Sequence, residues 1–378
     1  MPNSLQVASR KLVEHVLGRA GVHVGGARPW DVQVHDERFF LRVLTHGSLG
    51  FGESYMEGWW DCGQIDELVA RLLGGAADKR LFDWRKKLLL ASAWVSNAQT
   101  VVRAVQVAEV HYDLGNDFFE KMLGPSMNYS CGYWREADTL DAAQYAKMDL
   151  ICRKLQLQPG ERLLDIGCGW GGLVRYAAEK HGVECVGVTI SQEQADYATA
   201  HTAGLPVRIL RADYRDEAVS RLGPFDKVVS VGMFEHVGQR NHREYMRLAR
   251  RRLKEEGLFL LHTIGNDHSP TDAWLNRYIF PNGMLPSTVD LTRAAHGLFI
   301  QEDWHNFRAD YDKTIMAWYR NFEQHAASPG VTLPERFRRM WRYYLQTMAG
   351  AFRARSRNQL WQVVYSVRGV AGGYRSPR

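Results

Sequence analysis

Several features that would place this chain in a special class are missing from its sequence. Its five cysteines include no C-x-x-C pair and no metal-ligand spacing, which indicates reduced thiols in a reducing compartment. The most apolar stretch, residues 88–105, is broken by polar side chains, whereas a spanning helix needs about 20 mainly apolar residues. Residues 1–10 lack the apolar core of a signal peptide. We therefore expect a cytoplasmic protein whose contact with the inner membrane is peripheral.

The composition is that of an ordinary globular protein, with 45% hydrophobic and 24% charged residues. A length of 378 residues exceeds the size at which a single core usually stops growing, so two domains are expected. The formal net charge of +6 favours an anionic partner, such as nucleic acid, an anionic membrane surface or an acidic metabolite. No recognised DNA- or RNA-binding motif accompanies this charge, so we expect no nucleic-acid partner.

The first hundred residues differ in pattern from the rest. Alternation in residues 30–35 and 39–44 predicts two short strands joined by a turn at Asp36 and Glu37. Residues 47–60 are rich in glycine and aromatic side chains, which is typical of tight backbone approach. A wound surface loop over a small core and a ligand-binding segment remain equal interpretations of this stretch.

A change of pattern near residue 100 suggests a domain boundary. From Ile65 to about Val105 the pattern is helical, and the next region is of a different kind. We expect an N-terminal domain over residues 1–94, a linker over 95–107 and a second domain over 108–378.

Between Gly160 and Gly265 the chain alternates short apolar runs with helix-length segments. This alternation is typical of βαβ units and a parallel sheet. In such sheets, ligands bind beyond the carboxyl ends of the strands. The predicted strands are residues 162–166, 184–190, 207–210, 225–231 and 258–263.

A glycine loop follows the first of these strands and opens a helix. Gly167, Gly169 and Gly171 have the spacing G-x-G-x-G, not the G-x-G-x-x-G of dinucleotide enzymes. Asp165 precedes the loop, where a carboxylate suits an ammonium group better than a pyrophosphate. The second strand ends in Thr189, not in the acidic residue that a dinucleotide site would use. The loop therefore favours S-adenosylmethionine over NAD, and a purely structural turn is the remaining alternative.

The ends of the second and third strands supply further cofactor contacts. Thr189 and Gln194 are expected to share the ribose hydroxyls by neutral hydrogen bonds, in place of the more usual acidic side chain. Asp213, which ends the third strand, is expected to accept from the adenine amino group.

Motifs along nearly the whole chain resemble those of the cyclopropane-fatty-acyl-phospholipid synthases and, less closely, the mycolic acid cyclopropane synthases. The resemblance implies an α/β, Rossmann-like S-adenosylmethionine-dependent methyltransferase fold, with a parallel-rich central sheet flanked by helices. It also implies a small N-terminal α+β lipid-binding domain. The matching stretches are residues 47–60, 111–119, 127–134, 164–172, 188–191, 233–238, 278–281 and 360–364.

The same resemblance implies the reaction and its participants. S-adenosylmethionine is the methylene donor, an unsaturated phospholipid is the acceptor, a bound bicarbonate ion is the base, and the protein is a homodimer. The expected cofactor-binding residues are Tyr129, Ser130, Asp165, Gly167, Cys168, Gly169, Gly171, Thr189, Gln194, Asp213 and Tyr214.

By resemblance, bicarbonate is held by Cys131, Glu235, His262, Tyr311 and the backbone amide of Ile264. Plainer interpretations compete: a lone cysteine is usually a small buried hydrophobe, and Tyr311 alone reads as a core aromatic. His262 closes an apolar strand, where a hydrogen-bonded core histidine is common. Glu235 follows the end of a strand, where packing rarely needs a carboxylate, so its functional interpretation is favoured.

A carboxylate beside an anion needs a shared proton, because a like charge raises the pKa of a carboxyl group. We infer a coupled set in which His262 supplies a compensating proton and Glu235 receives the proton that bicarbonate abstracts. Direct action of Glu235 as the base stays open. So does a role for His236 in place of His262, although His236 is equally expected to cap a helix.

One residue departs from the family pattern. Met348 occupies a position where some relatives carry a cysteine that has been assigned as catalytic. A thioether cannot form a thiolate, so a covalent cysteine mechanism at that position is excluded for this chain.

Basic residues gather at 250–254 and 336–357, the latter interleaved with aromatics. Such residues suit anionic lipid headgroups, although a solvated helix face is equally expected for any single arginine. Two other functions stay open: an ordinary methyltransferase without ring closure, and a non-catalytic lipid-binding or lipid-transfer protein with a vestigial nucleotide pocket.

Overall fold

The computed structural model describes residues 4–74, 115–266, 271–354 and 358–378. They form two compact units. The helical unit consists of described residues within 1–96, 269–281 and 311–358, and the sheet unit of those within 97–268, 282–310 and 359–378. The helical unit thus includes two later segments of the chain, which a division into 1–94 and 108–378 does not anticipate. The expected linker over 95–107 lies outside the described residues.

The sheet unit is built on a seven-stranded sheet of order β5-β4-β3-β6-β7-β9-β8. The first five strands in this order pair in parallel, and β9 pairs antiparallel with both β7 and β8. The predicted parallel-rich sheet and its five predicted strands are confirmed. The strands are β3 (Arg162–Ile166), β4 (Glu184–Thr189), β5 (Val207–Arg211), β6 (Phe225–Val231), β7 (Leu253–Gly265), β8 (Ile300–Asn306) and β9 (Gln359–Ser366).

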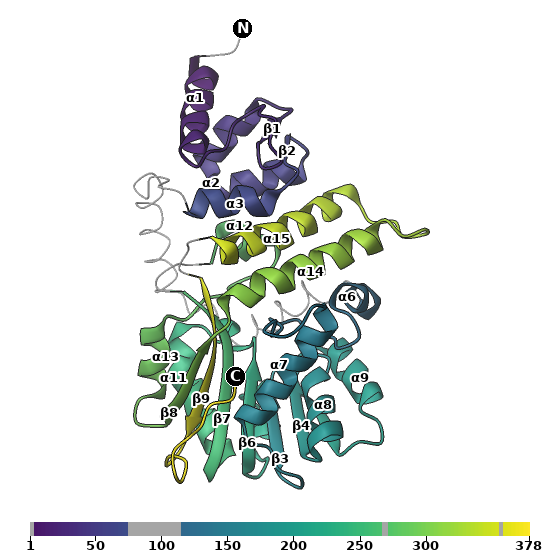
Figure 1. The fold of residues 1–378 in the computed structure, drawn as a ribbon, viewed down its shortest axis with the longest axis vertical. Helices are drawn as coiled ribbons and strands as arrows, with labels where there is room; N and C mark the ends of the chain where they lie inside the picture. Colours follow the sequence, from purple (N-terminus) through teal and green to yellow (C-terminus); the bar gives the residue numbers. More distant parts are fainter. Residues whose placement is uncertain (1–3, 75–114, 267–270, 355–357) are drawn as a thin grey trace. The chain divides into compact units, whose positions relative to one another are not determined.

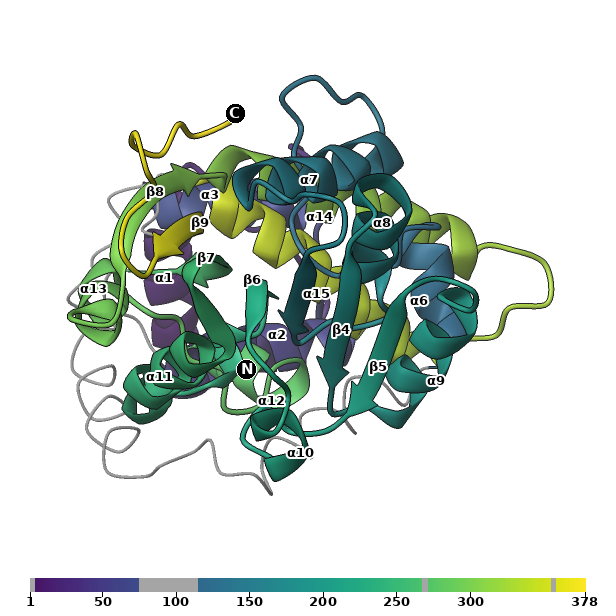
Figure 2. The same ribbon diagram turned by 90° about the horizontal axis from the view of Figure 1, so that it is seen from below.

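Helices cover both faces of this sheet (Figures 1 and 2). On one face lie α7 (Leu140–Lys154) and α8 (Gly172–His181), and on the other α11 (His242–Arg252) and α13 (Thr288–Ala295). The side chains of successive strand residues point to opposite faces of the sheet, so each strand contributes residues to two hydrophobic cores. The first core includes Leu163, Leu258 and Leu260, and the second includes Leu164, Phe259 and Leu261.

Shorter elements join the strands at the edge where the site is expected. The connections include α9 (Gln192–His201), α10 (Glu217–Ser220), and the 3₁₀ turns η1 (Phe234–His236) and η2 (Gln239–Asn241), while α6 (Asn116–Leu123) precedes the first strand of the sheet. The turn η1 follows directly on the carboxyl end of β6, so Glu235 lies at that edge of the sheet.

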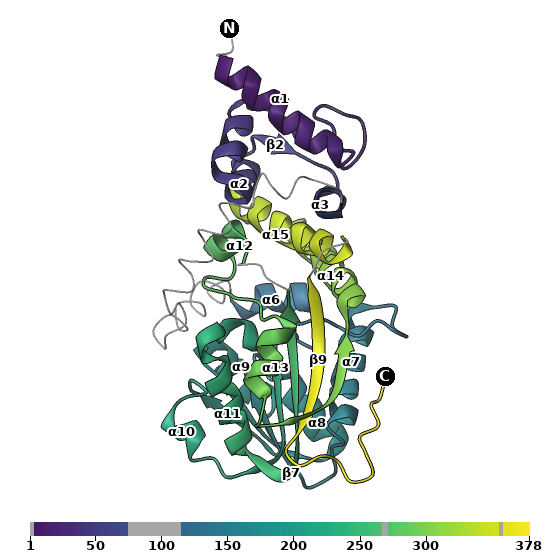
Figure 3. The same cartoon turned by 90° about the vertical axis from the view of Figure 1, so that its left-hand side faces the viewer.

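The helical unit packs α15 (Glu335–Arg353) beside α2 (Arg38–Met56) and α3 (Ile65–Gly74), as Figure 3 shows. Its other elements are α1 (Ser4–Arg19), α12 (Ala273–Tyr278), most of α14 (Arg308–Ala326), and a two-stranded ladder of β1 (Gln33–Val34) and β2 (Trp60–Asp61). No helix in the described ranges has the length and apolarity that crossing a membrane requires. The apolar stretch 88–105 lies outside those ranges.

The expected strand at residues 39–44 was wrong, because these residues lie in α2. The Asp36 carboxylate accepts from the backbone amide of Arg38 at 2.9 Å, so the expected hairpin turn starts a helix instead. Phe39 and Phe40 are both buried, and Phe39 packs on Trp60 at 6.0 Å between ring centroids. Two adjacent buried side chains fit a helix better than an alternating strand.

The glycine-rich segment 47–60 is mostly the second half of α2, so the interpretation as a surface loop was wrong. Gly47 has φ +59°, which kinks the helix. A Cβ on Gly52 would lie 2.4 Å from the Trp274 ring of α12, within the same unit. The glycine at 52 therefore serves close packing of a helix against an aromatic ring.

The arginines of α15 are engaged within the helical unit. Arg339 donates to the Asp61 carboxylate at 2.7 Å, and Arg342 makes a two-point contact with Glu323 at 2.9 and 2.6 Å. Arg353 similarly joins carboxylates of α3 and α14. Because these guanidinium groups are neutralised internally, the structure gives them a role in holding the helices together, which the expectation of lipid-headgroup contacts did not foresee.

Candidate active site

The glycine loop adopts backbone angles that side chains rarely tolerate. Gly167, Gly169 and Gly171 have φ of +91°, +55° and +81°, and α8 begins immediately afterwards. A Cβ on Gly171 would lie 2.9 Å from the Cβ of Ala198 in α9, so this glycine serves helix packing. A Cβ on Gly169 would meet no atom within 4 Å, so the loop leaves open space there. Backbone exposed beside open space is what close approach to a ligand requires.

Asp165 is buried at the end of β3 with an unsatisfied carboxylate oxygen. Its exposed fraction is 2%, and Oδ1 has no hydrogen-bond partner among the described residues. Burial raises the pKa of Asp165 to about 7, and the positive charge of Lys147 opposes this rise. An ammonium group at this position would satisfy the carboxylate, so the residue fits the amino group of S-adenosylmethionine.

Two polar residues of α7 hold the segment 128–130, and neither was predicted from the sequence. Lys147 is buried, and its Nζ donates to Asn128 Oδ1 and to Ser130 Oγ, each at 2.8 Å. Gln144 Nε2 donates to the carbonyl of Ser130 at 2.9 Å. Residues three apart share one face of a helix, so the pair acts as a clamp on the predicted cofactor-binding residues Tyr129 and Ser130. The available signal was a lysine and a glutamine on the inward face of a predicted helix.

The expected ribose and adenine contacts lie where the second and third strands end. The Thr189 hydroxyl donates to Gln194 Oε1 at 2.6 Å, and both side chains are buried. Arg215 donates to both oxygens of Asp213 at 2.7 Å, an ion pair that was not predicted from the sequence. Tyr214 is buried beside this pair. The cofactor roles of these residues stay predictions.

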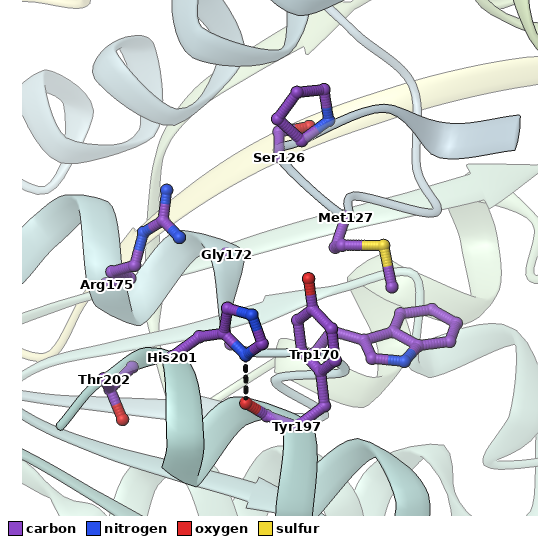
Figure 4. Close-up of a pocket in the computed structure, with 10 residues that line it drawn as sticks. Ser126, Met127, Trp170, Gly172, Arg175, Tyr197, His201 and Thr202 are labelled. Atoms are coloured by element: carbon purple, nitrogen blue, oxygen red, sulfur yellow. Dashed lines mark hydrogen bonds between the residues drawn. The ribbon is translucent and has the colours of Figure 1, made fainter. Parts of the chain in front are cut away.

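A small pocket lies beyond the glycine loop, between α8, α9 and residues 125–127 (Figure 4). It borders the loop through Trp170, Gly171 and Gly172, and beside it His201 Nδ1 donates to the Tyr197 carbonyl at 2.8 Å. Its lining does not include Asp165, Thr189 or Asp213. Of the predicted cofactor-binding residues, its lining contains Gly171. Cys168, within the loop itself, packs under Gly187 of β4 and is a buried core thiol.

Glu235 follows β6 in η1 and is 6% exposed. Its Oε1 accepts from the backbone amide of Ile264 at 2.6 Å, whereas Oε2 is buried with no hydrogen-bond partner among the described residues. The Ile264 amide, which the resemblance assigns to bicarbonate, is thus engaged with Glu235. Burial raises the pKa of Glu235 to about 7, so the carboxyl group is partly protonated near neutral pH.

His262 lies in β7 beside the end of β6, since the Gly232 amide donates to its carbonyl at 2.9 Å. Its Nδ1 contacts Gln362 Nε2 at 3.2 Å, and its buried Nε2 has no partner among the described residues. Burial lowers the pKa of His262 well below its ordinary value, and nearby positive charges lower it further. A neutral imidazole disagrees with the hypothesis that His262 supplies the compensating proton. The raised pKa of Glu235 assigns that proton to the carboxyl group.

Cys131 belongs to the same neighbourhood. Its thiol is buried and donates to the Gly132 carbonyl at 3.2 Å. The positive charge of Lys147 acts on Asp165 and lowers the pKa of His262, and the charge of Cys131 in turn raises the pKa of Lys147. His236 lies in η1 next to Glu235, where burial lowers its pKa to about 4.

Tyr311 and Met348 both belong to the helical unit. Tyr311 is a buried residue of α14, with its ring 4.7 Å from Phe352 and 6.0 Å from Trp318. Its contribution to the bicarbonate site stays a prediction. Met348 lies in α15 and is partly buried.

A parallel-rich sheet with a glycine loop after its first strand, and a buried carboxylate before that loop, defines an S-adenosylmethionine-dependent methyltransferase fold. The sheet unit is similar to solved structures of this class. The cyclopropane synthase MmaA2 from Mycobacterium tuberculosis is 30% identical with a TM-score of 0.64, over 71% of this chain and 99% of that one. The mycolic acid cyclopropane synthase CmaA1, solved with SAH and CTAB, is 32% identical with a TM-score of 0.64, over 69% and 97%.

The family model for mycolic acid cyclopropane synthetase matches residues 99–363. The cyclopropane-fatty-acyl-phospholipid synthase of Escherichia coli K12 is 50% identical over 373 residues, covering 97% of this chain and 96% of that protein. The chain belongs to the mycolic acid cyclopropane synthetase family and is an S-adenosylmethionine-dependent enzyme of the C-methyltransferase class.

Proposed function

We propose that this enzyme transfers a methylene group from S-adenosylmethionine to the cis double bond of an unsaturated phospholipid acyl chain, which becomes a cyclopropane ring. The relative from Escherichia coli, which is similar along nearly the whole chain, supports the substrate class. The observation that carries the proposal is the pair of buried, unsatisfied atoms Glu235 Oε2 and His262 Nε2. Plain methyl transfer needs no such pair.

The reaction makes two demands on the protein. When bound, S-adenosylmethionine supplies an electrophilic methyl group on sulfur, and bicarbonate supplies a small base. The alkene is a weak nucleophile, and its attack on the methyl group leaves a carbocation on the acyl chain. A proton must then leave the new methyl group before the ring closes. The site must therefore keep water from the cation and keep a base close to it.

We infer that Glu235 and His262 hold bicarbonate without repelling it. A buried polar atom without a partner costs free energy, so each of the two orphaned atoms has a place for a bound polar group. Protonated Glu235 is a donor to an oxyanion, and its pKa of about 7 makes that form available near neutral pH. When bicarbonate takes the proton of the methyl group and becomes carbonic acid, Glu235 receives that proton only after releasing its own to solvent, and its pKa of about 7 allows this release near neutral pH. Cys131 and Tyr311 complete the proposed set.

On the cofactor side, Asp165 fits the amino group, and the Lys147 and Gln144 clamp orders Tyr129 and Ser130. We further propose that the enzyme is a homodimer that works from the cytoplasm, bound peripherally at the inner membrane where its lipid acceptor resides.

Lipid analysis tests the proposal. Cells expressing the enzyme should contain phospholipids that have gained one methylene unit and lost the alkene, and cells expressing Glu235→Gln should not. A saturated methyl branch in place of the ring would favour an ordinary methyltransferase. Unchanged lipids, despite folded protein that binds S-adenosylmethionine, would favour a lipid-binding protein.

A titration of rate against bicarbonate tests the base. In carbonate-depleted buffer the rate should fall and recover when bicarbonate is added. His262→Ala removes a ligand of the ion, so added bicarbonate should partly rescue it. Glu235→Gln keeps the shape of the site but cannot take the proton onward, so turnover should fall far more than cofactor affinity. A flat wild-type curve in buffer free of dissolved carbon dioxide would remove the ion from the mechanism and leave Glu235 as the direct base.

A further inference from the structure

A buried row of polar residues crosses three neighbouring strands of the sheet unit. Gln362 of β9 lies directly opposite His262 of β7 on one side and His305 of β8 on the other. Residues directly opposite each other in antiparallel strands project to the same face. Gln362 has no exposed surface, and its Oε1 has no hydrogen-bond partner among the described residues.

The contact between Gln362 and His262 determines which ring nitrogen carries the proton. Gln362 Nε2 lies 3.2 Å from His262 Nδ1. In this amide orientation the nitrogen donates and Nδ1 accepts, which places the single N–H of a neutral imidazole on Nε2. The opposite amide orientation would place the carbonyl oxygen against Nδ1 and would leave Nε2 as a bare acceptor.

The surroundings of His262 explain why the ring is neutral and why this orientation is the useful one. Lys147 and Lys154 of α7 and His305 of β8 all disfavour a positive charge on the ring. Lys154 Nζ itself contacts His305 Nδ1 at 3.2 Å and pairs with Asp303 at 3.0 Å. A neutral histidine can help to bind an anion only through an N–H directed at it.

We infer that Gln362 is a positioning residue that holds His262 as the Nε2–H tautomer, so that the imidazole donates a hydrogen bond into the catalytic space. The inference rests on the proposed function in one respect: the acceptor of this hydrogen bond is the bound bicarbonate. The general logic is that of a metal-binding or catalytic histidine whose second nitrogen is fixed by a partner outside the site.

Nitrogen NMR of histidine-labelled protein, without cofactor or substrate, tests the tautomer directly. The imidazole signals that disappear in the His262→Asn variant are those of His262. In the wild type it should show a protonated, pyrrole-type Nε2 and an unprotonated, pyridine-type Nδ1. A pyrrole-type Nδ1 would overturn the inference, and this result needs no variant of Gln362 to fold.

Gln362→Met removes the amide at nearly constant volume and should allow a second, Nδ1-protonated form of His262 to appear. Gln346→Met is the matched control, because Gln346 is a buried glutamine of α15 that accepts from the Ile65 amide at 3.0 Å. The control should leave the His262 spectrum unchanged. An unchanged spectrum in folded Gln362→Met would also overturn the inference.

Kinetics separate this inference from the bicarbonate proposal. Loss of an outer partner of a histidine typically costs about 10–100-fold in ligand affinity or activity. We therefore expect Gln362→Met to raise the bicarbonate concentration for half-maximal rate by at least about tenfold, with S-adenosylmethionine affinity unchanged. If Gln362→Met reaches half-maximal rate at the same bicarbonate concentration as the wild type, the role of Gln362 is contradicted. If the wild-type rate does not depend on bicarbonate, the proposed base is contradicted, but the tautomer measurement remains valid.

Discussion

Glu235→Gln should make the protein more stable while it removes activity. The pKa of Glu235 rises from an ordinary 4.5 to about 7 because the carboxyl group is buried. Below the unfolded pKa, both states are protonated and the group has no effect. Between the unfolded-state pKa and the folded-state pKa, the carboxyl group is ionised in the unfolded protein but still protonated in the native one. The native state therefore loses stability as the pH rises through this range. Above the folded-state pKa the loss does not grow further. This cost is under about 1 kcal/mol at pH 5 and about 3 kcal/mol at pH 8.

A neutral glutamine avoids this cost and still accepts from the Ile264 amide. The stabilisation by Glu235→Gln should therefore grow by about 2–3 kcal/mol between pH 5 and pH 8. Urea unfolding of both proteins at the two pH values measures it. Glu256→Gln is the control, since it makes the same change at an exposed residue near the start of β7. A Glu235→Gln variant that is no more stable than the wild type at pH 8 would refute the buried, partly protonated carboxyl group.

Three other substitutions test separate parts of the site. Gly169→Val should abolish S-adenosylmethionine binding in calorimetry while the fold survives, since its side chain enters the open space beside the loop; retained binding would refute the cofactor assignment. Lys147→Met removes the bonds to Asn128 and Ser130, so it should weaken cofactor binding and cost about 1–3 kcal/mol of stability; unchanged affinity would show that the clamp is dispensable. Met348→Ala should cost less than the roughly 2–5 kcal/mol of a fully buried methionine and should keep turnover; near-total loss of turnover in folded protein would contradict a packing role.

The parallel half of the sheet could be predicted because each of its strands is a short apolar run followed by a helix-length segment. The antiparallel strands could not be predicted in this way. The strand β8 spans Ile300–Asn306, and its charged and polar residues show no regular alternation with apolar ones. Two long helices separate β9 from β8 in the sequence. Nothing local in the sequence indicates that β9 enters the sheet between β7 and β8. The pairing of Gln362 with His262 follows from that entry and was therefore missed.

The structure of the helical unit also depends on contacts that the local sequence does not indicate. Residues 39–44 alternate like a strand, but their burial against Trp60 is decided by packing within the unit. Likewise, the arginines of α15 read as a basic surface until their partners on α3, α14 and β2 are known. Of the candidate site, the glycine loop and Glu235 were predictable from strand ends. The neutral state of His262 depends on burial and on Lys147, which only the folded arrangement provides.

The fate of the transferred methyl group tests the central claim most directly. Purified enzyme, vesicles of an unsaturated phospholipid and S-adenosylmethionine carrying a fully deuterated methyl group would be incubated together, and the lipid product analysed by mass spectrometry. Ring formation requires the new methyl group to lose a hydron, so the product should retain all but one of the deuterium atoms and contain no alkene. A product that retains every deuterium atom of the methyl group would show transfer without deprotonation and ring closure, and would contradict the account.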